Sequence, residues 1–249
     1  AGSFVLYAVI TAGGPIDGEY ARAAGTTLKA LAPVRGRTMI ARTLDALLAC
    51  GIERIAVVGN DAVRDACVPV TPVRMIADAG TGAGNVLGAL DGWPDDASLL
   101  YLTCDMPYID APSLLWFLER IDPRALSMPL CEHGAFLERF PGAPPFGITL
   151  AGEQVVNGGV FHFPAGSRAR VRTLATTMFD ARKAPWKMAG VAGPLVLLRF
   201  AIGRISVSAL EARAKRLLGV PVAALRDAPA ELAYDADTIS EYIYAAARS

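Results

Sequence analysis

Short apolar runs alternate with amphipathic segments through the first half of the chain. Four mainly apolar runs predict buried strands, at 4–11, 55–59, 73–77 and 99–103. The intervening segments predict helices over 38–50, 61–67, 85–90 and 111–121. This alternation is typical of a mostly parallel sheet with right-handed crossovers, and it places a ligand site beyond the carboxyl ends of the strands.

The second half of the chain is less regular. A strand over 155–163 is interrupted by Gly158 and Gly159. Helices are expected near 167–182, 186–202, 206–218 and 239–247. No repeat or linker is visible, which favours a single domain over 1–249 with a helical elaboration at 183–229. The predicted fold class is therefore α/β, with three layers and a mostly parallel mixed sheet flanked by helices.

Composition excludes several classes of partner. The chain has 249 residues, is 53% hydrophobic and balances 24 Lys and Arg against 24 Asp and Glu, so no global field recruits nucleic acid or an anionic membrane. The four cysteines are widely spaced, which favours reduced core thiols and a cytoplasmic protein. The longest apolar stretch, near 189–202, is interrupted by Arg199 and falls short of the ~20 apolar residues that span a bilayer, so we expect no stable membrane insertion. We also expect no vesicle binding through the apolar run at 194–200.

The segment TAGGPIDGEYARAAGTTLKALAPV, from Thr11 to Val34, is a candidate triphosphate cradle. Gly13 and Gly14 end the first strand, where the lack of a Cβ lets backbone N–H groups approach an anion. Lys29 would neutralise charge on the α- and β-phosphates, and Arg22 in the same loop could assist. The segment matches neither the P-loop nor the dinucleotide-binding pattern, and alone it could equally be a tight turn beside a solvated lysine.

Two acidic segments are candidate metal ligands. Asp105 lies at the carboxyl end of the strand LLYLT, after Cys104, and a carboxylate at this edge suits Mg²⁺ together with substrate phosphates. A turn before Pro107 is the structural alternative. Asp237, in the sequence DADT, could supply a second carboxylate to the same ion or could belong to a simple helix start.

Two further segments are candidate contacts for the substrates. The glycine-rich sequence DAGTGAGN, from Asp78 to Asn85, could approach the edge of a nucleotide base. Asn157 and Gly158 could bind a hydroxyl or phosphate of an acceptor molecule. Each segment could equally be a turn. His133 and His162 are isolated in the sequence, and we assign neither a catalytic role.

Taken together, the chain resembles the nucleotidyltransferases with a glycosyltransferase-A-like, Rossmann-like fold, and most closely the molybdenum-cofactor guanylyltransferase-like NTP transferase domain. The resemblance covers essentially the whole chain. It rests on TAGG at 11–14, LKALAPVRGRTMI at 28–40, IAVVGN at 55–60, LTCDMP at 102–107, VNGG at 156–159 and DADT at 235–238.

The resemblance implies a role for each matching residue. Lys29 and Asp105 would be catalytic, and Asp105 and Asp237 would hold Mg²⁺. The nucleotide would be bound by Ala12, Gly13, Gly14, Arg22, Gly84 and Asn85, and the acceptor by Asn157 and Gly158. The family's loop usually reads GxGxR, whereas here Pro15, Ile16 and Asp17 follow Gly14, which leaves the role of the arginine open.

The implied reaction is Mg²⁺-dependent transfer of a nucleoside monophosphate from an NTP to a phosphorylated small-molecule acceptor, with release of pyrophosphate. One alternative is a catalytically impaired protein of the same fold that binds or senses nucleotides. Another is a nucleotide-sugar glycosyltransferase, which the absence of a DxD motif after the fourth strand disfavours. Residues 183–229 are expected to shape an acceptor pocket or a dimer contact, so a homodimer stays open.

Overall fold

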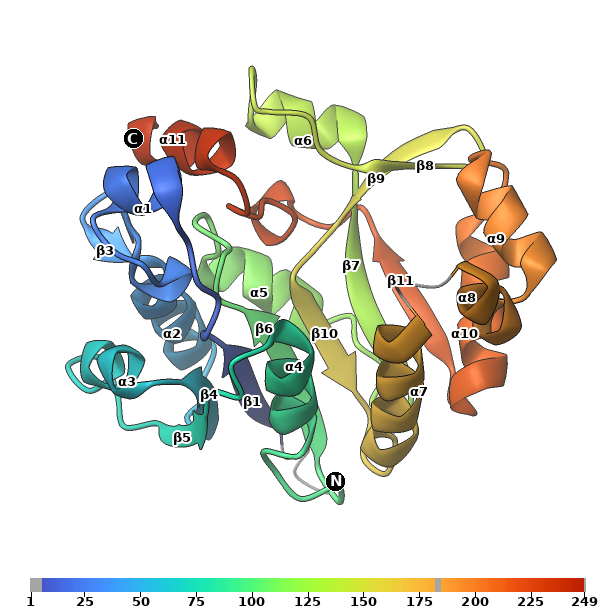
Figure 1. Cartoon of the computed structure of the whole chain (residues 1–249), viewed down its shortest axis with the longest axis horizontal. Coiled ribbons are helices and arrows are strands. Elements are labelled where there is room, and N and C mark those ends of the chain that lie inside the picture. Colours follow the sequence, from blue (N-terminus) through green and yellow to red (C-terminus); the bar gives the residue numbers. More distant parts are fainter. Residues whose placement is uncertain (1–5, 182–184, 249) are drawn as a thin grey trace.

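The structure is a computed structural model that describes residues 6–181 and 185–248. Within this part of the chain, nine strands form one mixed sheet, and β2 (Pro33–Val34) and β3 (Arg37–Thr38) form a separate hairpin (Figure 1). Eight strands follow one another across the sheet in the order β5 (Arg74–Ala77), β4 (Ile55–Gly59), β1 (Leu6–Thr11), β6 (Ser98–Thr103), β10 (Val160–Phe163), β7 (Leu126–Glu132), β9 (Glu153–Asn157) and β8 (Ile148–Leu150). The ninth, β11 (Val222–Arg226), pairs with β7.

The pairing directions bring the ends of several strands to one edge. Strands β5, β4, β1 and β6 are mutually parallel, so their carboxyl ends share an edge. Strand β10 is antiparallel to β6 and begins at that same edge, where Val160 lies opposite Leu102. The predicted strands and helices of the first half are confirmed, except that residues 4 and 5 lie outside the described residues.

Alternation along the strands builds a separate core on each face of the sheet. Ala8 and Ile10 of β1 belong to one core, with the apolar faces of α2 and α5. Val9 belongs to the core on the opposite face, which α4 and α7 cover (Figure 1). Because β1 is buried on both faces, it reads as a continuous apolar run, and this explains why the sequence signal was clear.

Capping residues in the sequence mark the start of several described helices, α2 and α11 among them. The described helices are α1 (Gly18–Ala24), α2 (Met39–Ala49), α3 (Asp61–Cys67), α4 (Gly82–Leu90), α5 (Ala111–Leu118), α6 (His133–Arg139), α7 (Arg168–Ala181), α8 (Pro185–Ala192), α9 (Pro194–Ala201), α10 (Val207–Leu218) and α11 (Ile239–Ala247). The Thr38 hydroxyl caps α2 by accepting from Ala41 N, as its position predicted. Thr238 caps α11 in a capping box with Glu241.

The predicted elaboration at 183–229 contains helices α8, α9 and α10 and also a strand that the sequence did not predict. Strand β11 continues the sheet in parallel with β7, with Val222 opposite Leu126. Its sequence, VAALR, is too short and too rich in alanine to be distinguished from a loop by periodicity. Residues 183 and 184 lie outside the described residues.

An aromatic cluster anchors the C-terminal segment beside the sheet edge. Tyr234 is fully buried among Tyr108, Phe136 and Phe140, and its hydroxyl donates to Glu241 O at 2.8 Å. This cluster joins α6 to the residues preceding α11 and holds the DADT segment against the sheet.

The interruption between β9 and β10 has a packing cause that can be tested. A Cβ on Gly158 would collide with Leu232 O and with the Pro129 ring, at 2.5 Å for Pro129 Cγ. The carbonyl belongs to the backbone and cannot rotate away. We expect Gly158→Ala to reduce the free energy of unfolding by about 1–3 kcal/mol, the usual cost of overpacking, in a urea titration.

The matched control is Gly88→Ala in helix α4, where the nearest atom to a new Cβ is Ile76 Cγ2 at 3.7 Å, an ordinary contact. This variant should be as stable as the wild type or more stable, because alanine favours helix. Equal stability of the two variants would contradict the packing argument.

Candidate active site

Lys29 is held at the sheet edge by backbone bonds to the glycine loop. It begins a single 3-10 turn (Lys29–Leu31), and its N–H donates to Gly14 O at 3.0 Å. Pro15 and Leu28 form an isolated antiparallel bridge, and Ile16 N donates to Thr27 O at 2.9 Å. The glycine loop and the lysine segment therefore form one unit, as their proximity in the sequence suggested.

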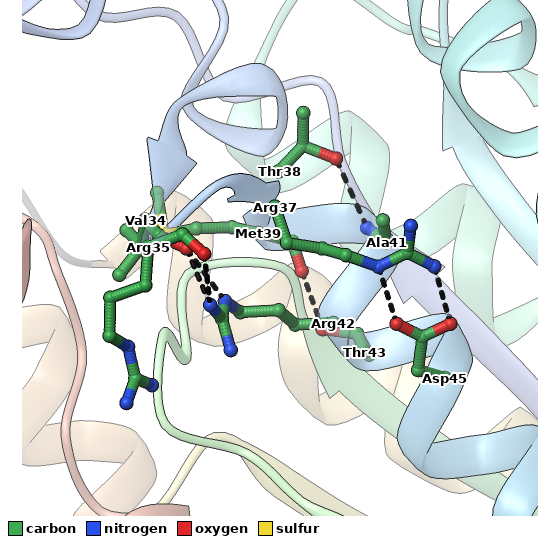
Figure 2. Close-up of polar contacts among 9 residues, drawn as sticks. All are labelled: Val34, Arg35, Arg37, Thr38, Met39, Ala41, Arg42, Thr43 and Asp45. Carbon is green, nitrogen blue, oxygen red and sulfur yellow. Dashed lines mark hydrogen bonds and ion pairs between the residues drawn. The ribbon is translucent and has the colours of Figure 1, made fainter. Parts of the chain in front are cut away.

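The chain following Lys29 is fixed by a hairpin (Figure 2). Arg35 and Gly36 connect β2 to β3 with φ angles of 52° and 76°, and paired positive φ angles are typical of a type I′ turn. The guanidinium of Arg42 on α2 donates to Val34 O through Nη2 at 2.5 Å and Nε at 3.1 Å. Arg37 forms a bidentate pair with Asp45 at 2.6 Å. These bonds lock the LKALAPVRGRTMI segment onto α2.

Three segments that are remote in the sequence meet at the Lys29 side chain. Its Nζ lies 3.1 Å from Asp105 Oδ2 and 2.5 Å from Asp237 Oδ1. Asp105 follows the end of β6 and accepts a backbone bond at its own carbonyl from Ala236 N at 2.8 Å. The Tyr20 hydroxyl donates to Ala236 O at 2.7 Å. The DADT segment is thus fastened to the sheet edge from both sides.

The ion pairs at this site stabilise the charged forms of Lys29 and Asp237. Burial alone would lower the pKa of Lys29, but the charge of Asp105 and the hydrogen bond with Asp237 outweigh it and raise that pKa above its usual range. Burial alone would raise the pKa of Asp237, but the bond and charge of Lys29 hold it below its usual range. Lys29 therefore stays cationic and Asp237 anionic at neutral pH.

Asp235 lies beside this pair and differs from Asp237 in its protonation state. Burial raises the pKa of its carboxyl well above the usual range, and the charges of Asp105 and Asp237 raise it further. Among the described residues, its Oδ1 has no hydrogen-bond partner, and neither has Oδ1 of Asp105. The site therefore combines two buried carboxyl oxygens that lack a described partner with one ammonium.

A cleft of about 530 Å³ opens at this edge of the sheet. Its walls come from the glycine loop, the lysine turn, the loop before α4 and the end of β6. Lining residues include Gly13, Gly14, Lys29, Asp78, Asn85 and Asp105. Each of these six lies in a segment that the sequence singled out, and Asp78 begins the glycine-rich segment proposed for the base.

The loop before α4 packs against the glycine loop without a gap. Asp78 Oδ1 accepts from Asn85 Nδ2 and from Gly80 N, each at 2.9 Å. A Cβ on Gly13 would lie 2.6 Å from Asn85 Nδ2 and 2.9 Å from Asp78 Cγ. Gly13 is therefore required for this close approach, whereas a Cβ on Gly14 would meet no atom within 4 Å and would face open space.

The remaining predicted residues are not lining residues of this cleft, and this includes Asp237, which reaches it only through its ion pair with Lys29. Ala12 is fully buried and its N–H donates to Val58 O at 2.8 Å, and Gly84 packs against Ala79 at the start of α4. Arg22 is exposed in the last turn of α1. Asn157 is exposed at the end of β9, and Gly158 is buried. Their functional roles stay predictions.

Sequence reasoning assigned no individual role to three contributors. Thr103, the last residue of β6, lines the cleft, and Asp78 directly follows β5, whereas Asp105 lies one residue beyond β6. The rule that identified Asp105, a carboxylate at the carboxyl end of a strand, also applies to Asp78. Tyr20 gives no sequence signal, because its bond to Ala236 joins residues 216 positions apart.

A comparison with known families assigns the chain to one of them. A model of the MobA-like NTP transferase domain matches residues 8–186, well over half of the chain. The chain belongs to this family. It is therefore a nucleotidyltransferase, and the resemblance stated from the sequence is confirmed at this level. The match ends within α8, before the rest of the elaboration.

Solved structures of similar proteins support the same assignment. A hypothetical transferase from Thermus thermophilus is 29% identical, with a TM-score of 0.81 over 96% of this chain and 100% of that one. A nucleotidyl transferase from Methanothermobacter (17% identity, TM-score 0.57, 98% and 97% coverage) shares the fold. So does 2-C-methyl-D-erythritol 4-phosphate cytidylyltransferase from Thermus thermophilus (16%, 0.53, 97% of each chain). A comparison with curated protein sequences gave no significant match.

The buried Asp235 carboxyl of this MobA-like domain gives a pH-dependent prediction. Its raised pKa means that the folded protein keeps a proton that the unfolded chain releases near 3.8. Stability is therefore lost as the pH rises from that value through the raised pKa. We expect Asp235→Asn, measured in EDTA at neutral pH, to raise the melting temperature by about 2–4 °C for each kcal/mol gained.

The gain should shrink as the pH falls toward 3.8, because the wild-type carboxyl is then protonated in both states. The control is Asp96→Asn, which changes an exposed aspartate and should leave the melting temperature unchanged. A melting temperature for Asp235→Asn at or below that of the wild type would contradict the assignment.

Proposed function

We propose that the chain is a Mg²⁺-dependent nucleotidyltransferase that moves a nucleoside monophosphate from an NTP to a phosphorylated small-molecule acceptor and releases pyrophosphate. The observation that carries the proposal is the Lys29 ammonium, which lies 3.1 Å from Asp105 and 2.5 Å from Asp237 in the cleft behind the glycine loop. Family membership establishes nucleotidyl transfer. The metal, the acceptor and the residue roles are the proposal.

The lysine has donor capacity left for a phosphate. An ammonium has three N–H donors, and Asp105 and Asp237 accept two of them. No other described side chain or carbonyl accepts from Lys29 Nζ. The third N–H is therefore available to a triphosphate oxygen, while the carboxylates fix the direction of the ammonium.

The residues at this site suit Mg²⁺. Mg²⁺ prefers one or two carboxylates completed by substrate phosphates and water over an all-protein cage. Asp105 Oδ1 is buried without a described partner, and Asp237 offers a second carboxylate from the facing segment. Among the described residues, no group of three or more His, Cys, Asp or Glu side chains forms a cage, in keeping with a site completed by the nucleotide. When bound, the ion would neutralise phosphate charge.

The chain's own residues would contribute by positioning and charge. An acceptor phosphate oxygen attacks the α-phosphorus in line, a new P–O bond forms, and the bond to the bridging oxygen of pyrophosphate breaks. Backbone N–H groups of the Gly13–Gly14 turn would orient the phosphates, and the Lys29 ammonium would stabilise charge on the leaving group. No side chain is required as a nucleophile.

The proposal of a phosphorylated acceptor is supported by one protein of the same fold, 2-C-methyl-D-erythritol 4-phosphate cytidylyltransferase. Asn157 and Gly158 stay our candidates for acceptor contacts. A phosphorylated acceptor would supply the attacking oxygen without a general base.

The central test is pyrophosphate release by Lys29→Ala and Asp105→Asn across the four common NTPs and a panel of phosphorylated acceptors. Loss of a preorganised charge typically costs about 2.7–4 kcal/mol of barrier, so each variant should be roughly a hundred to a thousand times slower. The control, Lys215→Ala on the surface of α10, should retain the wild-type rate.

Wild-type rates in both site variants would refute the proposed catalytic roles. Nucleotide binding without turnover by the wild type on the full panel would instead support the impaired, nucleotide-sensing alternative. Consumption of nucleotide sugars in place of NTPs would support the glycosyltransferase alternative.

The metal proposal has its own test. Thermal stabilisation by NTP should require Mg²⁺ and disappear in EDTA, because the carboxylates at the site repel an uncompensated triphosphate. Asp237→Asn should require a higher Mg²⁺ concentration for half-maximal stabilisation by NTP, by about tenfold for each 1.4 kcal/mol of lost binding. An NTP effect that is identical in EDTA and Mg²⁺ would exclude the metal from this site.

A further inference from the structure

Helix α9 presents an apolar face to solvent at the end of the molecule opposite α3 (Figure 1). Leu195, Leu198 and Ile202 are 58%, 58% and 54% exposed and recur at the spacing of one helical face. The other side of the helix is turned inward, where Val196 packs against a core cluster that contains Ile205 and other buried residues. The outward face is therefore not needed to hold α9 in the fold.

The segment that carries this face is strongly cationic. Residues 181–210 contain Arg182, Lys183, Lys187, Arg199 and Arg204 and no Asp or Glu, in a protein whose total charge is zero. Lys187, Arg199 and Arg204 are exposed, and no carboxylate of the described residues pairs with any of them. The charges of these three side chains are thus left without an ion pair among the described residues.

A groove formed in part by α8, the helix that precedes α9, contains further cations. It has a volume of about 550 Å³ and lies between α7, α8 and α10. Arg170 and Arg213 line it, together with the apolar side chains of Leu174, Val191 and Leu217. Arg213 donates to Val191 O at 2.6 Å, and its Nε is buried without a partner among the described residues.

We propose that the α9 face, defined as Leu195, Leu198 and Ile202 with Arg199 and Arg204, docks on the surface of an anionic lipid bilayer. An exposed apolar stripe flanked by cations matches the interfacial region of such a bilayer, where side chains enter the headgroup boundary and arginines meet lipid phosphates. No described helix is long and apolar enough to cross the bilayer, so the docking is peripheral.

Charge distinguishes this occupant from a second copy of the chain. A twofold symmetric contact through α9 would place the face against itself and bring its arginines close to those of the partner copy. No acidic residue within 181–210 is present to compensate them. An anionic bilayer provides the opposite charge together with an apolar interior.

This proposal is independent of the nucleotidyl transfer reaction, because the face shares no residue with the cleft. It departs from the expectation drawn from the sequence, which predicted no vesicle binding. Composition could not show that Leu195 and Leu198 point outward while Val196 points inward. The length of the apolar stretch excluded only a helix that spans the bilayer.

The test is co-sedimentation of the full chain with vesicles, without any substrate. Vesicles of phosphatidylglycerol and phosphatidylcholine in equal parts should bind the protein, vesicles of phosphatidylcholine alone should not, and added salt should weaken the binding. Arg199→Gln with Arg204→Gln should weaken binding about tenfold to thirtyfold. Leu195→Gln with Leu198→Gln should weaken it by at least about tenfold.

The matched controls change side chains of similar exposure elsewhere. Leu115→Gln with Leu137→Gln and Arg120→Gln with Arg124→Gln should bind like the wild type. Circular dichroism confirms that each variant is folded. Absence of wild-type binding, or equal binding to both kinds of vesicle, overturns the proposal.

Sedimentation velocity tests the remaining occupant of this face, a second copy of the chain. A wild-type dimer that Leu195→Gln with Leu198→Gln converts to a monomer would assign the face to a second copy and overturn docking on lipid. A monomer that binds anionic vesicles through this face supports the proposal. Pyrophosphate release, measured separately without vesicles, should be unchanged in all four double variants.

Discussion

The site depends on one ammonium shared by two carboxylates. Lys29 comes from the first strand-to-helix connection, Asp105 from the end of β6 and Asp237 from the segment before α11. Electrostatic attraction alone would not hold three such remote segments, since an exposed ion pair contributes about 1 kcal/mol or less. Hydrogen bonds to backbone atoms hold these segments together instead. Ala236 is bonded both to Asp105 and to Tyr20, and Lys29 is bonded to Gly14, so the charges meet in a frame that is already fixed.

That frame also sets the balance of charge in the cleft. Two carboxylates against one ammonium leave an excess of negative charge where we propose that a triphosphate binds. In a half-buried site this repulsion is stronger than in water. Under the proposed function, a divalent cation is therefore part of the binding equilibrium and not an optional addition. The raised pKa of Asp235 fits the same balance, because a neutral third carboxyl adds no further repulsion.

The sequence predicted those parts of the structure that rest on local rules. Buried parallel strands give continuous apolar runs, and Gly13 and Asp105 lie at strand ends, so both the sheet and its ligand edge could be predicted. What escaped prediction depends on contacts between remote segments. Strand β11 is defined by its pairing with β7, and Tyr20 by its bond to Ala236. Gly158 has an ordinary backbone, and only the carbonyl of Leu232 shows why a side chain does not fit there.

The distribution of charge shows why a whole-chain total is a poor guide to surfaces. The sum is zero, and from it we expected no attraction to anionic partners. Residues 181–210 nevertheless carry five cations and no acid, so the remainder of the chain carries the opposite excess. Asp78 and Asp105 line the cleft at the sheet edge, whereas Lys187 and Arg199 lie on α8 and α9, at another end of the molecule (Figure 1). Salt limits the reach of an exposed charge to about 8–10 Å. Each end of the molecule therefore attracts partners according to its own charge, and the total charge of the chain decides neither interaction.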